Sequence, residues 1–295
     1  MAVMPVADAN GIEIAYETLG DPADPTVLLV MGLGSQMVHW DPEFCQGIVD
    51  RGFHVVRFDN RDMGGSTRID VPVDVLGVLS ASASGGEAPP VPYLLTDMAA
   101  DAVGLLDHLG IERAHLFGVS MGGMIVQTIA IEHPQRVATL TSVMSTTGDP
   151  DVGTPTGEAM TALLAPPPQS REQLQDTAVH HAGVWGSPGL FDEARLRRAA
   201  GQAWDRGYNP AGTARQLAAI LASGSRSAAL AGIDVPTLVI HGTADTLVQP
   251  SGGERTAEVV PDAKLLVVEG MGHDLAPPLW PQIIGALADH AGAHT

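Results

Sequence analysis

The run Gly118-Val119-Ser120-Met121-Gly122 has the residue types and spacing of a turn that presents a reactive serine. The serine directly follows the apolar run AHLFGV and precedes the stretch MGGMIVQTIAIEH, so the sequence predicts a sharp turn from a strand into a helix. Glycines make room for neighbouring chains at such a turn, and backbone N–H groups at a helix start favour developing negative charge. We therefore expect Ser120 to be the nucleophile of an acyl transfer. The alternative is a Gly-Ser turn that only links a strand to a helix.

Two later loops supply candidates for the base and the acid that a serine nucleophile needs. The strand-like run PTLVIH is followed by Gly-Thr-Ala and Asp245, and the run AKLLVVE is followed by Gly-Met-Gly and His273. The order Ser, Asp, His, with each residue after a strand, is one known order of a catalytic triad. We expect His273 to accept the proton of Ser120, and Asp245 to hold the imidazole in the correct tautomer.

Other residues compete for both roles. Asp149 and Asp151 follow a strand-like run that ends near residue 144, so they are rivals for the acid. Asp245 is favoured because it lies immediately after a strand, whereas the rivals open a long segment that contains no clear strand. The chain contains 11 histidines, and for His273 the alternative is an ordinary surface histidine.

Acyl transfer also needs two backbone donors that point at the developing oxyanion. Met121 supplies one by position, because it follows the nucleophile directly. The second is expected from the loop after the strand-like run TVLLVM, and we assign it to the N–H of Leu33, which lies between two glycines. A nucleotide-binding loop is the alternative, but the segment MGLGSQ lacks the full G-x-G-x-x-G pattern and the lysine of a P-loop.

Strand-like and helix-like segments alternate along the chain, which is typical of an α/β fold with a mostly parallel sheet buried on both faces. Strands are predicted at residues 26–31, 54–59, 114–119, 137–144, 236–241 and 263–269, with an antiparallel edge strand at 13–19. Helices are predicted at roughly 42–51, 95–109, 121–132, 251–260 and 279–291, and two of them end before Pro134 and Pro261.

Two segments interrupt this alternation. Residues 68–92 contain SASASGGEAPPVP and are expected to form a long loop or insertion over one end of the sheet. Residues 146–230 contain no clear strand and are expected to form a helical cap inserted between two strands. The predicted organisation is a hydrolase-like core at 1–145 and 231–295, with the cap at 146–230.

Composition narrows the partners. The chain of 295 residues has 15 Lys and Arg against 34 Asp and Glu, a formal charge of -19, which disfavours nucleic acid and anionic membrane surfaces. Cys45 is the one cysteine, so an internal disulfide and a multi-cysteine metal site are excluded. The sequence shows neither a signal-peptide pattern nor an apolar run long enough to span a membrane, so we expect a cytoplasmic protein, monomeric or homodimeric.

Several further residues have two readings. The turn Asp59-Asn60-Arg61-Asp62 is interpreted as a salt-bridged turn near the surface, although its charges could orient active-site loops. Trp185 and Trp204 either shield the site or pack ordinary helices. Cys45 is interpreted as a small buried residue and not as a catalytic thiol. Several methionines near the predicted site are assigned no role beyond filling the core.

Five segments carry a resemblance to a known family: VLLVMGLGSQMVHW, VVRFDNRDMGGST, HLFGVSMGGMIVQ, PTLVIHGTADTLV and VVEGMGHDL. Together they resemble the aclacinomycin methylesterase group of α/β-hydrolase carboxylesterases and its mycobacterial lipase-like relatives. The similarity covers nearly the whole chain and is weakest in residues 68–92 and 146–200. It implies an α/β-hydrolase fold and ester hydrolysis without a cofactor or metal, with a triad that matches Ser120, Asp245 and His273. One departure is Met31-Gly32, where many hydrolases of this fold have His-Gly.

The expected reaction is hydrolysis of a small to medium apolar carboxylic ester through an acyl-enzyme. One alternative is a C–C bond hydrolase or enol-lactonase, whose anionic substrate would need a positive pocket, for which the candidates are Arg195, Arg197, Arg198 and Arg206. A second alternative is a protein of the same fold that binds a small ligand without turnover. Peroxide could also replace water in a side activity. The fold alone does not distinguish between these functions.

Overall fold

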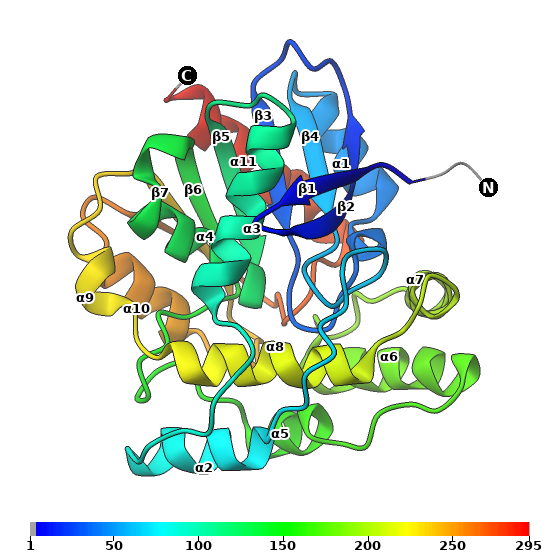
Figure 1. The fold of residues 1–295 in the computed structure, drawn as a ribbon. Helices are drawn as coiled ribbons and strands as arrows, with labels where there is room; N and C mark the ends of the chain where they lie inside the picture. Colours follow the sequence, from blue (N-terminus) through cyan, green and yellow to red (C-terminus); the bar gives the residue numbers. More distant parts are fainter. Residues whose placement is uncertain (1–3, 295) are drawn as a thin grey trace.

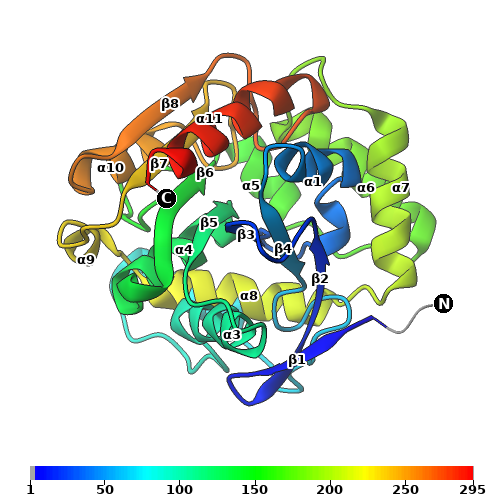
Figure 2. The same cartoon turned by 90° about the horizontal axis from the view of Figure 1, so that it is seen from above.

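The computed structural model describes residues 4–294, which form an eight-stranded sheet with helices on both faces (Figures 1 and 2). The strand order is β1-β2-β4-β3-β5-β6-β7-β8; β1 and β2 are antiparallel, and β2 runs antiparallel to β4, whereas all the other neighbours are parallel. The strands are β1 (Val6–Ala9), β2 (Ile12–Leu19), β3 (Thr26–Val30), β4 (His54–Phe58), β5 (Ala114–Val119), β6 (Val137–Val143), β7 (Thr237–Gly242) and β8 (Lys264–Val268).

The central strands are apolar because both faces of the sheet are covered. Every residue of β3, β4 and β5 is buried. Figure 2 shows α1 (Pro42–Val49) and α11 (Trp280–Gly292) along one face, where they share an apolar cluster with the sheet. The opposite cluster involves α3 (Leu95–His108), α4 (Met121–Glu132) and the end of α10 (Ser251–Val259). Because strands β3 to β8 run parallel to one another, they end at one common edge of the sheet, where the loops that follow them converge.

Between β6 and β7 the chain leaves the sheet and forms five helices: α5 (Gly157–Leu163), α6 (Arg171–Trp185), α7 (Glu193–Asp205), α8 (Pro210–Ser223) and the short α9 (Ser227–Leu230). We call α5–α8 the inserted helices. Each begins at a residue whose side chain accepts a backbone N–H of the first turn, as expected for polar helices that need capping. They lie below the sheet in Figure 1, on the side where the parallel strands end.

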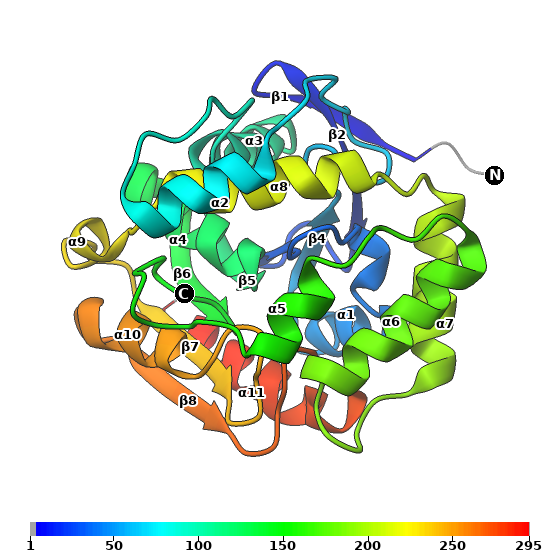
Figure 3. The ribbon, with the colours of Figure 1, turned by 90° about the horizontal axis from the view of Figure 1, so that it is seen from below.

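The sequence predicted these core elements closely, with two differences. It missed β1, a four-residue strand that pairs only with β2. It also predicted a long loop at 68–92, where the structure contains α2 (Val75–Ser84). Asp74 caps this helix, Gly85 ends it in a left-handed conformation, and α2 packs along α8 (Figure 3). The helix was missed because packing against α8, rather than local propensity, determines its structure.

Within residues 4–294, three short 3-10 helices complete the fold: η1 (Met37–His39), η2 (Pro134–Arg136) and η3 (Pro277–Leu279). Among the described residues, no helix is both long and apolar enough to cross a membrane.

Candidate active site

Ser120 lies at the turn between β5 and α4, in a backbone conformation that L-residues rarely adopt. Its φ is 55° and its ψ is -121°. A Cβ on Gly118 would lie 2.2 Å from the carbonyl oxygen of Gly122, and a Cβ on Gly122 would lie 2.0 Å from that of Val30. Glycine is therefore required at both positions of the motif. Backbone strain of this kind costs on the order of 1–3 kcal/mol and is typically found at functional sites.

Two contacts, from the end of β6 and from the segment just after it, hold this turn in place. The N–H of Ser120 donates to the carbonyl of Val143 at 3.0 Å, and Ser145 Oγ donates to the carbonyl of Ser120 at 2.8 Å. The α4 helix begins at Met121, so the Met121 amide is one of the N-terminal donors that have no partner within the helix. The serine hydroxyl and this amide therefore lie together at the start of the helix, as the sequence predicted.

Asp245 and His273 form a close pair, although 28 residues separate them in the sequence. His273 Nδ1 lies 2.7 Å from Asp245 Oδ2, and the Asp245 side chain is fully buried. The other oxygen of Asp245 accepts the N–H groups of Leu247 and Val248, each at 2.9 Å. The carboxylate is thus held through both oxygens, one of which contacts the imidazole of His273.

The rival acids lie in a different network. Asp149 accepts hydrogen bonds from Ser225 and Ser227, and both Asp149 and Asp151 pair with Arg255. His273 pairs with Asp245 instead. Among the described residues, Ser120 Oγ and His273 form no hydrogen bond, so the transfer between them stays a prediction. Catalytic hydrogen bonds are often long or poorly aligned without substrate.

His241 is a contact of the acid that the sequence analysis missed. Its Nε2 lies 3.4 Å from Asp245 Oδ2 and 2.8 Å from the carbonyl oxygen of Val248. Because the Val248 carbonyl can only accept, Nε2 carries the hydrogen in this arrangement. The run His241-Gly-Thr-Ala-Asp245 places the two side chains four residues apart, a spacing that gave no signal by itself.

The surroundings of Asp245 predict how stability changes in acid. Burial opposes ionisation, but the charge of His273 and the hydrogen bonds from His241 and His273 lower the pKa of Asp245 from 3.8 to about 2. Stability from the ionised carboxylate is therefore fully present above about pH 4 and is lost as the pH falls through about 2. We expect the wild type to have a higher free energy of unfolding than Asp245→Asn, and this difference should be about 2 kcal/mol larger above pH 4 than in strong acid.

Urea unfolding of both proteins between pH 5 and pH 2 measures this difference. A gap in the free energy of unfolding that does not shrink as the pH falls would contradict the assignment of the low pKa to Asp245.

The loop that carries His273 is fastened to the end of α6. The N–H of His273 donates to the carbonyl of Trp185 at 2.5 Å, and the N–H of Gly272 donates to Ser187 Oγ at 2.9 Å. Ser187 Oγ in turn donates to Asp274, whose pKa is raised by burial. The sequence analysis missed Ser187, because it lies 86 residues before His273 and in no motif.

The loop that carries Leu33 lies against Ser120. A Cβ on Gly32 would lie 3.1 Å from Ser120 Cβ. In the part of the chain that the structure describes, no protein group accepts a hydrogen bond from the Leu33 amide. The structure thus places this loop beside Ser120, where the sequence analysis expected the second oxyanion donor.

The turn Asp59-Asn60-Arg61-Asp62 differs from its interpretation as a surface turn. Asp59 and Asp62 are fully buried, and Asn60 and Arg61 nearly so. Arg61 pairs with Asp101 at 2.6 Å. The charges are satisfied internally, so the turn can be buried despite its polar sequence.

The remaining candidates have structural surroundings. Cys45 is fully buried, and burial raises its pKa to about 11, in agreement with the interpretation as a small buried residue. Trp185 packs on His181, and Trp204 stacks on Tyr208. No group of three or more His, Cys, Asp or Glu side chains in residues 4–294 is arranged to hold a metal ion.

Comparison with known proteins agrees with this architecture. Residues 25–276 match the family model described as the alpha/beta hydrolase fold. Among curated proteins, rhodomycin D methylesterase DnrP of Streptomyces peucetius is 29% identical over 95% of each chain. The 3-oxoadipate enol-lactonase 2 of Acinetobacter baylyi is 27% identical over 88% of this chain and 86% of its own.

A solved structure of a hydrolase from Pseudomonas aeruginosa superposes with a TM-score of 0.72 at 26% identity, covering 99% of both chains. The family match spans most of the sheet, the Ser120 turn and the loops of Asp245 and His273. The chain therefore belongs to the α/β-hydrolase fold family.

Proposed function

We propose that the protein is a serine carboxylesterase in which Ser120 is the nucleophile, His273 the base and Asp245 the acid. The observation that carries this proposal is the strained Ser120 turn, with the Leu33 loop against it, together with a buried Asp245–His273 pair formed by the loops after β7 and β8. These are the parts that two-step acyl transfer requires. The methylesterase relative over 95% of the chain points to the same reaction class.

The proposed reaction has two balanced steps. Ser120 Oγ attacks the ester carbonyl carbon while His273 Nε2 takes the hydroxyl proton and then passes it to the leaving alkoxide, which departs as the alcohol. Water then attacks the acyl-enzyme by the same route and releases the carboxylic acid and free Ser120. The amides of Leu33 and Met121 stabilise the oxyanion in both steps.

The inserted helices serve as the cap in this proposal, within residues 146–230. Figure 3, viewed from the side of these helices, shows α5, α6, α7 and α8 arranged around the ends of the central strands. Alanine and leucine are common in this segment, which favours a small to medium apolar ester over a sugar or phosphate. The nucleophile is thus reached past side chains that select the substrate.

A series of p-nitrophenyl esters of increasing acyl length tests the proposal. We expect turnover that rises to an optimum at short or medium acyl chains and then falls as the acyl group outgrows the space under the inserted helices. The measurement is kcat/KM for each ester, with enzyme pretreated with a fluorophosphonate as the control. No turnover on any ester, together with no fluorophosphonate labelling, would refute the esterase proposal and favour ligand binding without catalysis.

The second candidate function is hydrolysis of an anionic substrate, either at a C–C bond or at an enol-lactone. The enol-lactonase relative favours it. It is the weaker one, because three of the four arginines that could bind the substrate carboxylate are already paired, and the fourth, Arg198, is exposed. Arg195 pairs with Asp41 and Glu43, Arg197 with Asp176 and Glu193, and Arg206 with Asp59. Faster turnover of such an anion than of every neutral ester would reverse this ranking.

A further inference from the structure

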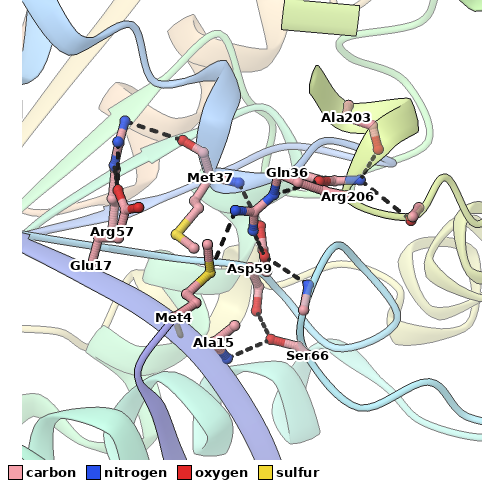
Figure 4. Close-up of polar contacts among 12 residues, drawn as sticks. Met4, Ala15, Glu17, Gln36, Met37, Arg57, Asp59, Ser66, Ala203 and Arg206 are labelled. Carbon is pink, nitrogen blue, oxygen red and sulfur yellow. Dashed lines mark hydrogen bonds and ion pairs between the residues drawn. The ribbon is translucent and has the colours of Figure 1, made fainter. Parts of the chain in front are cut away.

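The loop proposed to supply an oxyanion donor, residues 31–37, is held at both ends by the turn after β4. Asn60 Nδ2 donates to the carbonyl of Met31 at 2.9 Å. The N–H of Met37 donates to Asp59 Oδ1 at 2.7 Å, as Figure 4 shows. Both side chains are almost fully buried. The two ends of the loop are therefore fixed by the core of the protein.

The middle of the loop is held by one of the inserted helices. The N–H of Gly34 donates to Gln216 Oε1 at 2.9 Å, and Gln216 Nε2 donates to the carbonyl of Arg61 at 2.9 Å. Gln216 lies on α8 and is fully buried. Gly34 has a φ of +68° and no side chain of its own to fix it, so this hydrogen bond limits which way the neighbouring Leu33 peptide can turn.

A second inserted element holds the same loop through Gln36. Arg206, the residue after α7, donates through Nε to Gln36 Oε1 at 3.0 Å and forms an ion pair with the buried Asp59 (Figure 4). Gln36 Nε2 donates to the carbonyl of Ala203 at 2.8 Å. The same carboxylate that binds the Met37 amide is thus neutralised from the inserted segment.

From these contacts we propose that Gln216 and Arg206 are positioning residues that hold the Leu33 amide in place for oxyanion stabilisation. The inference rests on the proposed esterase function and adds a role for the inserted helices in the rate of the reaction. Donors contribute fully only when they are held within about 0.5 Å of the productive position. In the described part of the chain, the loop is held at its centre by Gly34 and Gln36, whereas the Leu33 amide stays without a protein acceptor.

The test compares an ordinary p-nitrophenyl ester with its thionoester, in which sulfur replaces the carbonyl oxygen. Sulfur is a weak hydrogen-bond acceptor, so a thionoester gains little from the oxyanion donors. We expect Gln216→Leu to lower kcat for the oxygen ester about 10- to 100-fold, somewhat less than loss of a donor itself. KM should change little. The kcat for the thionoester should fall much less, so the ratio of kcat for the oxygen ester to kcat for the thionoester should decrease.

Gln175→Leu is the matched control, because Gln175 Nε2 donates to the carbonyl of Arg197 within the inserted helices and, among the described residues, forms no hydrogen bond with residues 31–37 or the β4 turn. Its rate ratio should equal that of the wild type. Gln216→Glu tests rescue: a protonated carboxyl, which burial favours, can accept from Gly34 and donate to the Arg61 carbonyl. We expect its ratio to stay close to that of the wild type.

Arg206→Met tests the second contact independently, in case Gln216→Leu does not fold. It should show the same fall in the ratio, whereas Arg171→Met, which breaks the exposed pair of Arg171 with Asp205, should not. Thermal unfolding of each variant shows that it is folded under the assay conditions.

Folded Gln216→Leu and Arg206→Met proteins that lose both rates equally, or lose neither, would overturn the inference and leave the esterase proposal intact. A wild type that hydrolyses neither ester and takes no fluorophosphonate label would overturn both.

Discussion

Replacing Ser120 with alanine is expected to lower kcat for ester hydrolysis by on the order of 10⁶-fold, to the background of the binding site alone. In the proposed mechanism the hydroxyl oxygen of Ser120 forms the acyl-enzyme, and the alanine side chain offers no atom to replace it. The substitution removes one oxygen and leaves the strained backbone, so stability should not fall. The measurement is turnover of the best p-nitrophenyl ester, together with labelling by a fluorophosphonate.

Ser142→Ala is the matched control for this experiment. Ser142 is a buried serine on β6, next to the nucleophile turn, and its hydroxyl is bonded by Gln127. Ser142→Ala should keep both turnover and labelling. Turnover or labelling that persists in Ser120→Ala would show that another residue is the nucleophile.

Asp245→Asn is expected to lower kcat by about 10⁴-fold at neutral pH, the size of effect seen when the acid of a triad becomes an amide. An asparagine can offer its amide N–H to His273 Nδ1 and so favour the tautomer that cannot accept the serine proton. It also loses the negative charge that stabilises the imidazolium formed during the reaction. In the proposed mechanism Asp245 does not touch the substrate, so KM should change little.

Asp149→Asn is the control, because sequence reasoning left Asp149 as a rival for the acid. Its contacts with Ser225, Ser227 and Arg255 indicate a structural role, so kcat should remain within a few-fold of the wild type after correction for the folded fraction. A larger loss in Asp149→Asn than in Asp245→Asn would reverse the assignment.

The parts of the fold that could be predicted from the sequence are those with a local signal. The strands around the site are runs of Val, Leu and Ile, because both faces of the sheet are covered. The turn at Ser120 is marked by Gly118 and Gly122, where the structure leaves no space for a side chain. Asp245 and His273 were found because each directly follows a strand, and their contact at 2.7 Å agrees with that placement.

The parts that could not be predicted depend on contacts between distant segments. The Gly34–Gln216 hydrogen bond joins residues 182 positions apart, and Gln216 lies in no recognisable pattern. The charged sequence of the turn at Asp59 predicts a surface turn. Its burial could not be predicted, because the partner of Asp59, Arg206, lies 147 positions later. The helix at Val75–Ser84 ends in a run of Ser and Ala and is followed by glycine and proline, so the segment resembles a loop in sequence, whereas in the structure the helix packs along α8.

The hydrogen bonds from the inserted helices to residues 31–37 have a consequence for protein engineering. Exchanging the segment between β6 and β7 for that of a relative is a natural way to change which ester is accepted. In this chain such a chimera would also exchange the residues at 206 and 216, while Gln36, Asp59 and Gly34 stayed with the recipient. A graft that kept arginine at 206 and glutamine at 216 should therefore transfer selectivity without loss of speed, and one that changed them should give a slow enzyme whatever it binds.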